Sequence, residues 1–169
     1  FSGKTVLLGG PIDLLGKEYT GAASAGADFS GCLAWKPIGS NAKPFAGTLE
    51  GQGEKVSNLR INATTNYQGL FGALTGKVYE TTVLSGSVQG ANYIAGIAGL
   101  AKSGAVVQNC STGTGLAVKG DEFAAGIVGE ISGGGATIEK CVNDAAVTSG
   151  GEAGGIAASA YGSGTSTIK

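Results

Sequence analysis

The sequence contains no histidine and no methionine, and it has only three cysteines, three prolines and one tryptophan. The lack of histidine excludes serine–histidine–aspartate triads, histidine general bases and most zinc sites. Three cysteines without a Cys-x-x-Cys spacing do not suggest the disulfide framework of a small secreted domain. We therefore expect no catalytic residues, no metal site and no cofactor.

Charge and long apolar runs are also scarce. Charged residues make up 14% of the chain, and the formal net charge is −1, which argues against a nucleic-acid partner. No apolar run approaches 18 residues, so membrane insertion is not expected. Hydrophobic residues nevertheless make up 42%, which is too many for simple disorder. A length of 169 residues then predicts one folded domain.

Glycine is abundant, at 33 of 169 residues, and part of it forms a repeated Gly-x-x-Gly element. The element recurs at steps of about 30 residues, which is typical of repeat architectures. The three full copies begin at Gly69, Gly96 and Gly126 and end at Gly72, Gly99 and Gly129, and a degenerate fourth copy spans 155–158.

Other apolar positions keep the same step along the chain. Within the segments, apolar residues alternate with polar ones, which favours short strands over helices. Val56 and Leu59 are predicted to occupy the same repeat positions one coil before Val78 and Thr81. The repeated positions are the pairs Val78/Thr81, Val107/Cys110 and Ile138/Cys141 and the set Val88, Val118 and Val147.

Short strands that recur in register predict coils stacked through parallel pairing. We predict an all-β fold, a right-handed parallel β-helix (β-solenoid) of about five coils with three short strands per coil. The single domain would span 1–169, with an insertion or decorated loop at 17–44, regular coils at 45–160 and a tail at 161–169. We also expect the chain to be a fragment of a larger protein.

Several motifs resemble those of a known family. The run from Phe45 to Gly53 reads Phe-Ala-Gly-Thr-Leu-Glu-Gly-Gln-Gly, and the segments 56–61 and 69–72 follow in a matching order. In this order they resemble the GLUG-type repeat proteins of bacterial cell surfaces. Segments 12–14 and 35–39 are similar to elements that precede this pattern.

The resemblance implies a right-handed β-helix on an exported bacterial surface protein. Similar segments flank the catalytic domains of immunoglobulin-A-cleaving metalloproteases and occur in large adhesins. Because the repeats are scaffold motifs, the resemblance implies no catalytic residues. It implies an extracellular or cell-surface location.

Cys110 and Cys141 occupy the same slot in adjacent coils, so their Cα atoms could lie about 5 Å apart. Two interpretations follow. The pair could form a disulfide between coils, or two buried thiols could pack as small hydrophobic side chains. The second is favoured because Leu59 and Thr81 are placed in the same slot. Cys32 is expected to pair with neither.

Aromatic residues outside the alternating positions are candidates for a ligand surface. Most of the aromatic surface is expected from Trp35, Tyr19, Tyr67, Phe71, Tyr79 and Tyr93. Of these, Trp35, Tyr19, Tyr79 and Tyr93 are the candidates to stack on sugar rings or anchor a protein partner. The alternative is local packing beneath the 17–44 loop or at coil corners. The acids Asp121, Glu122 and Glu130 are too scattered to favour a calcium site.

These observations predict a non-catalytic structural or adhesive segment. Neither end carries an evident polar cap, so we expect further copies of the chain or adjoining domains to stack on the open coil ends. A host glycan or protein is a further candidate partner. The alternative is a carbohydrate-binding or carbohydrate-active β-helix of the lyase or hydrolase type, although no suitable acid–base cluster is evident.

Overall fold

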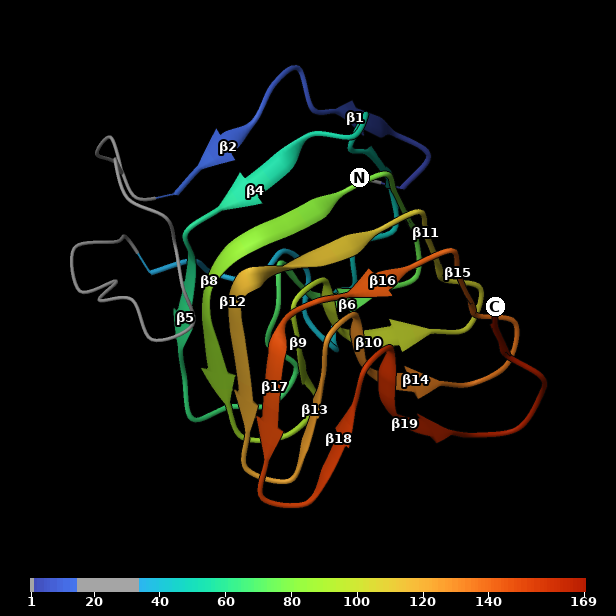
Figure 1. Cartoon of the computed structure of the whole chain (residues 1–169). Helices are drawn as coiled ribbons and strands as arrows, with labels where there is room; N and C mark the ends of the chain where they lie inside the picture. The colour runs from blue at the N-terminus through green and yellow to red at the C-terminus, as the bar shows by residue number, and fades with distance from the viewer. Residues whose placement is uncertain (1, 15–33) are drawn as a thin grey trace.

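The computed structural model describes residues 2–14 and 34–169, and all regular structure within them is β-strand. The strands wind into a parallel β-solenoid of about four turns, consistent with a right-handed β-helix (Figure 1). This confirms the predicted fold class. Every strand pair in the described residues is parallel, and the chain visits four sheets in the order A, B, D, C before it returns to sheet A.

Sheets A and B contain the larger numbers of strands. In spatial order, sheet A consists of β1 (Thr5–Leu7), β3 (Thr48–Glu50), β7 (Lys77–Tyr79), β11 (Val106–Gln108), β15 (Thr137–Glu139) and β20 (Thr167–Ile168). Sheet B consists of β2 (Ile12–Asp13), β4 (Lys55–Ser57), β8 (Thr82–Gly90), β12 (Ser111–Gly120) and β16 (Val142–Asn143), with β5 (Leu59–Asn62) paired to β8 and β17 (Ala146–Ser149) paired to β12.

Sheets C and D complete each coil. Sheet C consists of β6 (Phe71–Leu74), β10 (Ala98–Lys102), β14 (Val128–Ser132) and β19 (Ala157–Tyr161). Sheet D consists of β9 (Ile94–Ala95), β13 (Phe123–Ala125) and β18 (Glu152–Gly154). The coil therefore has four sheets where three strands were predicted. Only two residues separate each sheet D strand from the sheet C strand that follows it, so the sequence predicts the two as one segment around the Gly-x-x-Gly element.

The register between coils confirms most of the predicted repeat. Ala98 pairs with Phe71 on one side and Val128 on the other, which aligns the second glycines of the three Gly-x-x-Gly elements. Val118 pairs with both Val88 and Val147, as predicted.

One alignment in the predicted repeat is wrong. Val56 pairs with Val83 in sheet B, whereas the partner of Val78 in sheet A is Leu49. Leu59 lies opposite Gly86, so it does not share the slot of Thr81. In the coil that contains β3 and β4, the corner between sheet A and sheet B includes glycines 51 and 53. This corner differs from those of the later coils, so the predicted alignment of Val56 with Val78 is shifted from the true one.

The core is a set of inward ladders that run along the solenoid. In sheet A, alternate residues point inward, because successive strand residues face opposite sides. The ladder is almost fully buried in the middle coils, where Val78, Val107 and Ile138 are each 0% exposed. Each coil alone would leave such a row open to water, so stacking supplies the hydrophobic stabilisation.

The corner after sheet A has the same construction in three coils. The corner residue has a positive φ in each coil, with values of 48° at Glu80, 54° at Asn109 and 53° at Lys140. The side chain of the next residue then turns toward the strand that precedes the corner. There the hydroxyl of Thr81 and the thiols of Cys110 and Cys141 donate hydrogen bonds to the carbonyl two residues earlier. A small side chain with a donor is what this corner accommodates.

The described part of the predicted 17–44 insertion continues the first coil. The backbone of Ile38 forms a parallel bridge with Phe71, and Phe45 forms one with Leu74. The described residues 34–44 therefore belong to a turn of the solenoid. The rest of the predicted insertion, residues 17–33, lies outside the described residues. At the other end, β20 of the predicted tail pairs with β15 in sheet A.

Candidate functional site

A stack of aromatic rings runs along three coils where sheet D begins. The ring centroids of Tyr67 and Tyr93 are 5.3 Å apart with an interplanar angle of 11°. Tyr93 and Phe123 are 5.0 Å apart at 9°. Tyr67 and Tyr93 have φ values of 60° and 62°, so the same unusual turn presents both rings in the same direction.

Glu130 is a buried acid next to this stack. It lies in β14, is 7% exposed and pairs with Leu100 of the preceding coil. The hydroxyl of Tyr67 forms a hydrogen bond with the Glu130 side chain. Burial raises the pKa of Glu130, and the Tyr67 hydrogen bond opposes part of that rise. Burial and the Glu130 charge together raise the pKa of Tyr67.

Replacing Glu130 by glutamine is expected to stabilise the protein above the carboxyl's unfolded-state pKa. The folded pKa is the higher one, so the folded state binds more protons and stability falls as pH rises through the window between the two values. Glutamine can still accept the Tyr67 hydrogen bond but carries no charge, which should restore about 1 kcal/mol. Thermal melts from acidic to neutral pH would measure the difference. An unchanged pH slope in Glu130→Gln would contradict this assignment.

A groove of about 440 Å³ lies beside the Tyr67 end of the stack. One wall comes from the segment that precedes β3, and the other from the turn after β5. The lining residues are Lys36, Pro37, Gly39, Ser40, Asn41, Thr65, Asn66, Tyr67 and Gln68.

The glycines of the repeat allow neighbouring coils to approach closely. A Cβ atom on Gly99 would lie 2.4 Å from the carbonyl carbon of Tyr67, and one on Gly129 would lie 2.4 Å from that of Tyr93. A Cβ on Gly72 would lie 2.4 Å from the carbonyl oxygen of Gly39. These glycines are therefore required by packing and hold the aromatic turns in place.

The first glycine of each element has a similar cause. A Cβ on Gly69, Gly96 or Gly126 would meet a carbonyl oxygen of the next coil at 2.8, 2.8 and 2.5 Å, respectively. The repeated glycines are thus positions that close packing between coils requires.

The four aromatic residues predicted as a ligand surface do not gather in one place. Tyr93 lies in the stack, and Tyr79 lies on sheet A between Glu50 and Gln108. Trp35 is half-buried against the core and donates its indole N–H to the Leu70 carbonyl at 3.0 Å. Tyr19 lies outside the described residues.

Cys110 and Cys141 are brought together, and both are free thiols. The hydrogen bond with Cys141 and burial raise the pKa of the Cys110 thiol. Cys110 is 1% exposed and belongs to the core cluster. The pair therefore packs between coils in this structure, in line with the interpretation as small apolar side chains. Cys32 lies outside the described residues.

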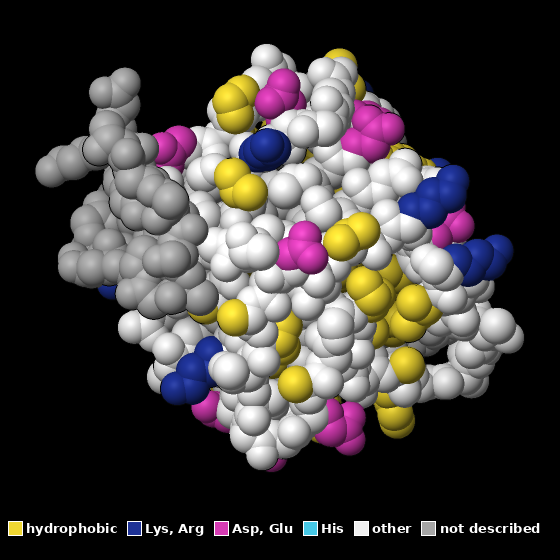
Figure 2. Space-filling model, viewed as in Figure 1, with side chains coloured by type: hydrophobic (Ala, Val, Ile, Leu, Met, Phe, Trp, Pro, Cys, Tyr) yellow, Lys and Arg dark blue, Asp and Glu magenta, His cyan; other side chains and the backbone are white. Residues whose placement is uncertain are grey.

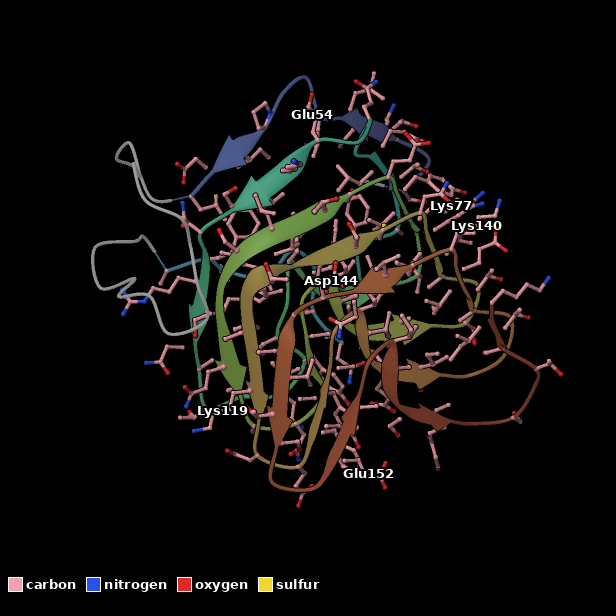
Figure 3. The ribbon with its side chains drawn as sticks, viewed as in Figure 1. Glu54, Lys77, Lys119, Lys140, Asp144 and Glu152 are labelled. Carbon is pink, nitrogen blue, oxygen red and sulfur yellow. The ribbon has the colours of Figure 1, made fainter. Side chains whose placement is uncertain are left out.

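Charged groups do not form a catalytic cluster in the described part of the chain. Figure 3 shows the labelled acids and lysines spread over separate strands and corners, with Glu54 and Glu152 at opposite ends of the view. No group of three or more histidine, cysteine, aspartate or glutamate residues in the described ranges could hold a metal ion. Within the same ranges, no helix is long and apolar enough to cross a membrane.

The sequence analysis named Tyr67 among the aromatic residues and Glu130 among the acids, but it did not name Phe123 or group the three as parts of one site. The signal was present, because an aromatic residue precedes each full Gly-x-x-Gly element. However, Tyr67 lies two residues before its glycine, whereas Tyr93 and Phe123 lie three before theirs. The one-residue difference hides the row in a comparison at fixed spacing.

Comparisons with known proteins support the fold. The chain resembles the solved structure of a candidate immunoglobulin A1 protease from Bacteroides ovatus, with a TM-score of 0.59 and 22% identity. The match covers 99% of this chain and 59% of that one, so the chain spans less than two thirds of the solved protein. At this identity the likeness defines the class of fold, a β-solenoid, and no activity.

One curated protein is also similar in sequence. Halomucin from Haloquadratum walsbyi (strain DSM 16790 / HBSQ001) is 30% identical over 128 residues. The match covers 69% of this chain and only 1% of Halomucin. No family model matches the chain, so the resemblance to GLUG-type repeats is not confirmed.

Proposed function

We propose that this chain is a non-catalytic structural segment of an extracellular or cell-surface protein, and that its C-terminal end receives a further β-coil. The observation that carries the proposal is the open core at that end. Figure 2 shows hydrophobic side chains gathered on the face formed by the last coil, over β16 and β19.

The core ladders lose their cover in the last coil. In sheet A, Ile138 is 0% exposed, whereas its partner Ile168 in the last strand is 52% exposed. Val118 is 1% exposed, but the paired Val147 is only half-buried. Apolar rows that face water favour a partner that buries them.

A glycine at the same end points to the shape of that partner. Gly69, Gly96 and Gly126 are each covered by a carbonyl of the following coil, whereas a Cβ on Gly155 would meet nothing within 4 Å. Among the described residues, no neighbour therefore requires a glycine at position 155. A further coil of the same cross-section, stacked in parallel register, would require it.

The coil that fits is the N-terminal coil of a second copy. Its strands β1 and β2 belong to sheets A and B, the same sheets that end in β20 and β16 at the other end. Its inward residues Val6 and Ile12 are only partly buried and pack against the core. Stacking of this kind is heterologous, so it builds filaments unless it closes into a ring.

Association should therefore increase with protein concentration and depend on the last coil. Ile168→Lys places a charge on the open edge and is expected to weaken association about tenfold or more, because the lysine would be buried without a partner. Sedimentation velocity from micromolar to millimolar concentration, with negative-stain microscopy, measures this.

Leu84→Lys is the matched control. Leu84 is 39% exposed on β8, in the middle of the solenoid, so this variant should associate like the wild type. A wild-type chain that stays monomeric at millimolar concentration would overturn the stacking proposal. Equal association of Ile168→Lys and the wild type would overturn the assignment of the C-terminal edge.

The location rests on separate support. The structural neighbour is named for a protease of immunoglobulin A1, and Halomucin is the relative in sequence. Both are consistent with a segment that works outside the cell. The non-catalytic assignment draws on the dispersed charges of the described residues and on a scaffold whose repeated positions serve packing.

A further inference from the structure

The groove beside Tyr67 has the chemistry of a small-ligand site. Its volume of about 440 Å³ falls within the range of ordinary ligand pockets. Its described lining residues provide hydroxyls, amides, one ammonium group and one aromatic ring, and none of them is a carboxylate. Such a lining suits a ligand with many hydroxyl groups and a flat apolar face.

Several polar groups of the groove are left without a partner inside the described part of the chain. Asn41 uses only its backbone carbonyl, which accepts a hydrogen bond from Lys102 Nζ at 2.8 Å. Asn66 Oδ1 accepts from the Asn92 N–H at 3.2 Å, which leaves its Nδ2 group to donate. Lys36 is exposed and carries the single formal charge of the lining.

Both walls of the groove are held rigidly. Gln68 is 8% exposed, and its Nε2 donates to Thr65 Oγ1 at 3.0 Å and to the Asn66 carbonyl at 2.8 Å. On the other wall, the backbones of Ser40 and Lys43 exchange hydrogen bonds of 2.9 and 3.1 Å. Walls fixed before binding reduce the entropy that a ligand must overcome.

The Tyr67 ring ends the aromatic stack at the groove. One face packs on Tyr93 at 5.3 Å, and the hydroxyl is held by Glu130. A ring fixed in this way can offer its remaining surface to a sugar, whose C–H face packs on aromatic carbon. Glu130 itself does not line the groove.

We propose that this groove binds a saccharide that carries an acidic group, with Tyr67 beneath a sugar ring and Lys36 paired to the acid. Lys102, which reaches the Asn41 carbonyl, adds a second positive charge at the rim. The amides of Asn41 and Asn66 provide donors for hydroxyl oxygens. This binding is separate from coil stacking, because the groove is lined by residues between 36 and 41 and between 65 and 68, outside the strands β1, β2, β16 and β20 that would meet in the stack.

Tetragalacturonate, with cellotetraose as an uncharged oligosaccharide of the same length, tests the proposal. In two-dimensional amide NMR of the whole chain, tetragalacturonate should shift resonances of residues 36–41 and 65–68. Cellotetraose should bind at least about tenfold more weakly, because it lacks the charge-assisted hydrogen bond to Lys36.

Variants then assign the contacts. Lys36→Ala should weaken tetragalacturonate binding about tenfold and leave cellotetraose unchanged, and Lys77→Ala on sheet A should alter neither. Tyr67→Leu should weaken both, whereas the matched Tyr79→Leu should not, with melting curves to establish that each variant is folded. The absence of shifts at millimolar tetragalacturonate, shifts elsewhere, equal affinity for the neutral sugar, or an unchanged Lys36→Ala variant would each overturn the proposal.

Discussion

Replacing Gly99 by alanine is expected to destabilise the protein by about 3 kcal/mol or more. The added Cβ would lie 2.4 and 2.5 Å from the carbonyl carbon and Cα of Tyr67 and 2.8 Å from the Gln68 nitrogen. All three are backbone atoms of the neighbouring coil, so no side chain can move aside. The coils would have to separate, which would disrupt the parallel ladder between β6 and β10.

Chemical denaturation of Gly99→Ala beside Gly155→Ala measures this effect. Gly155 belongs to the same repeated element, but a Cβ there meets nothing within 4 Å and its φ is not in the left-handed region. Alanine at 155 should therefore leave stability unchanged or slightly raise it, by restricting the unfolded chain. Similar stability of the wild type and Gly99→Ala would contradict the close-packing explanation of the repeat.

Truncating Ile138 to alanine should cost about 2–5 kcal/mol. The side chain is 0% exposed and lies in the sheet A ladder between Val107 and Ile168. Its removal leaves a cavity in a wall of stacked strands, which relaxes only partly. The free energy of unfolding from denaturant titration measures the loss.

Ile168→Ala supplies the comparison one coil further along. The side chain is 52% exposed, so its truncation in the monomer should cost less than about 1 kcal/mol. If a second copy covers the last coil, the cost should grow with protein concentration. Equal losses for Ile138→Ala and Ile168→Ala at low concentration would mean that the last coil is closed in a way the described residues do not reveal.

The period of the glycine elements was sufficient to predict the stack of coils. The similar steps of 27 and 30 residues between Gly69, Gly96 and Gly126 indicate similar lengths of chain per turn, and parallel pairing then follows from geometry. The alternation within segments also predicted which residues enter the core. Both inferences are local, since each uses only the order and polarity of residues.

The corners of the coil were harder to predict. Val56 was aligned with Val78, but it pairs with Val83 in another sheet. The number of residues per coil stays nearly constant even when one corner is longer and another shorter. The repeat period therefore does not reveal that a strand has been assigned to the wrong sheet. Sheet D, with strands as short as Ile94–Ala95, escaped detection for a related reason.

The candidate site was predictable only in part. Tyr93 and Tyr67 were both named among the aromatic surface residues, but Phe123 and the buried Glu130 were not grouped with them. The groove combines two segments about 25 residues apart whose spatial proximity depends on the register of the first coils. The spacing of residues along the chain does not show that these two segments lie side by side.

By itself, the sequence determined the parallel β-solenoid, the repeated glycines and the inward ladders, because polarity and chain length per turn act through neighbouring residues. Only the tertiary structure decided which glycines are covered by the next coil, which rings stack, and where the core lies open. Those features depend on contacts between coils. Gly126 and Gly155 both precede an isoleucine in the repeated element, but within the described residues only Gly126 is covered by the backbone of another coil.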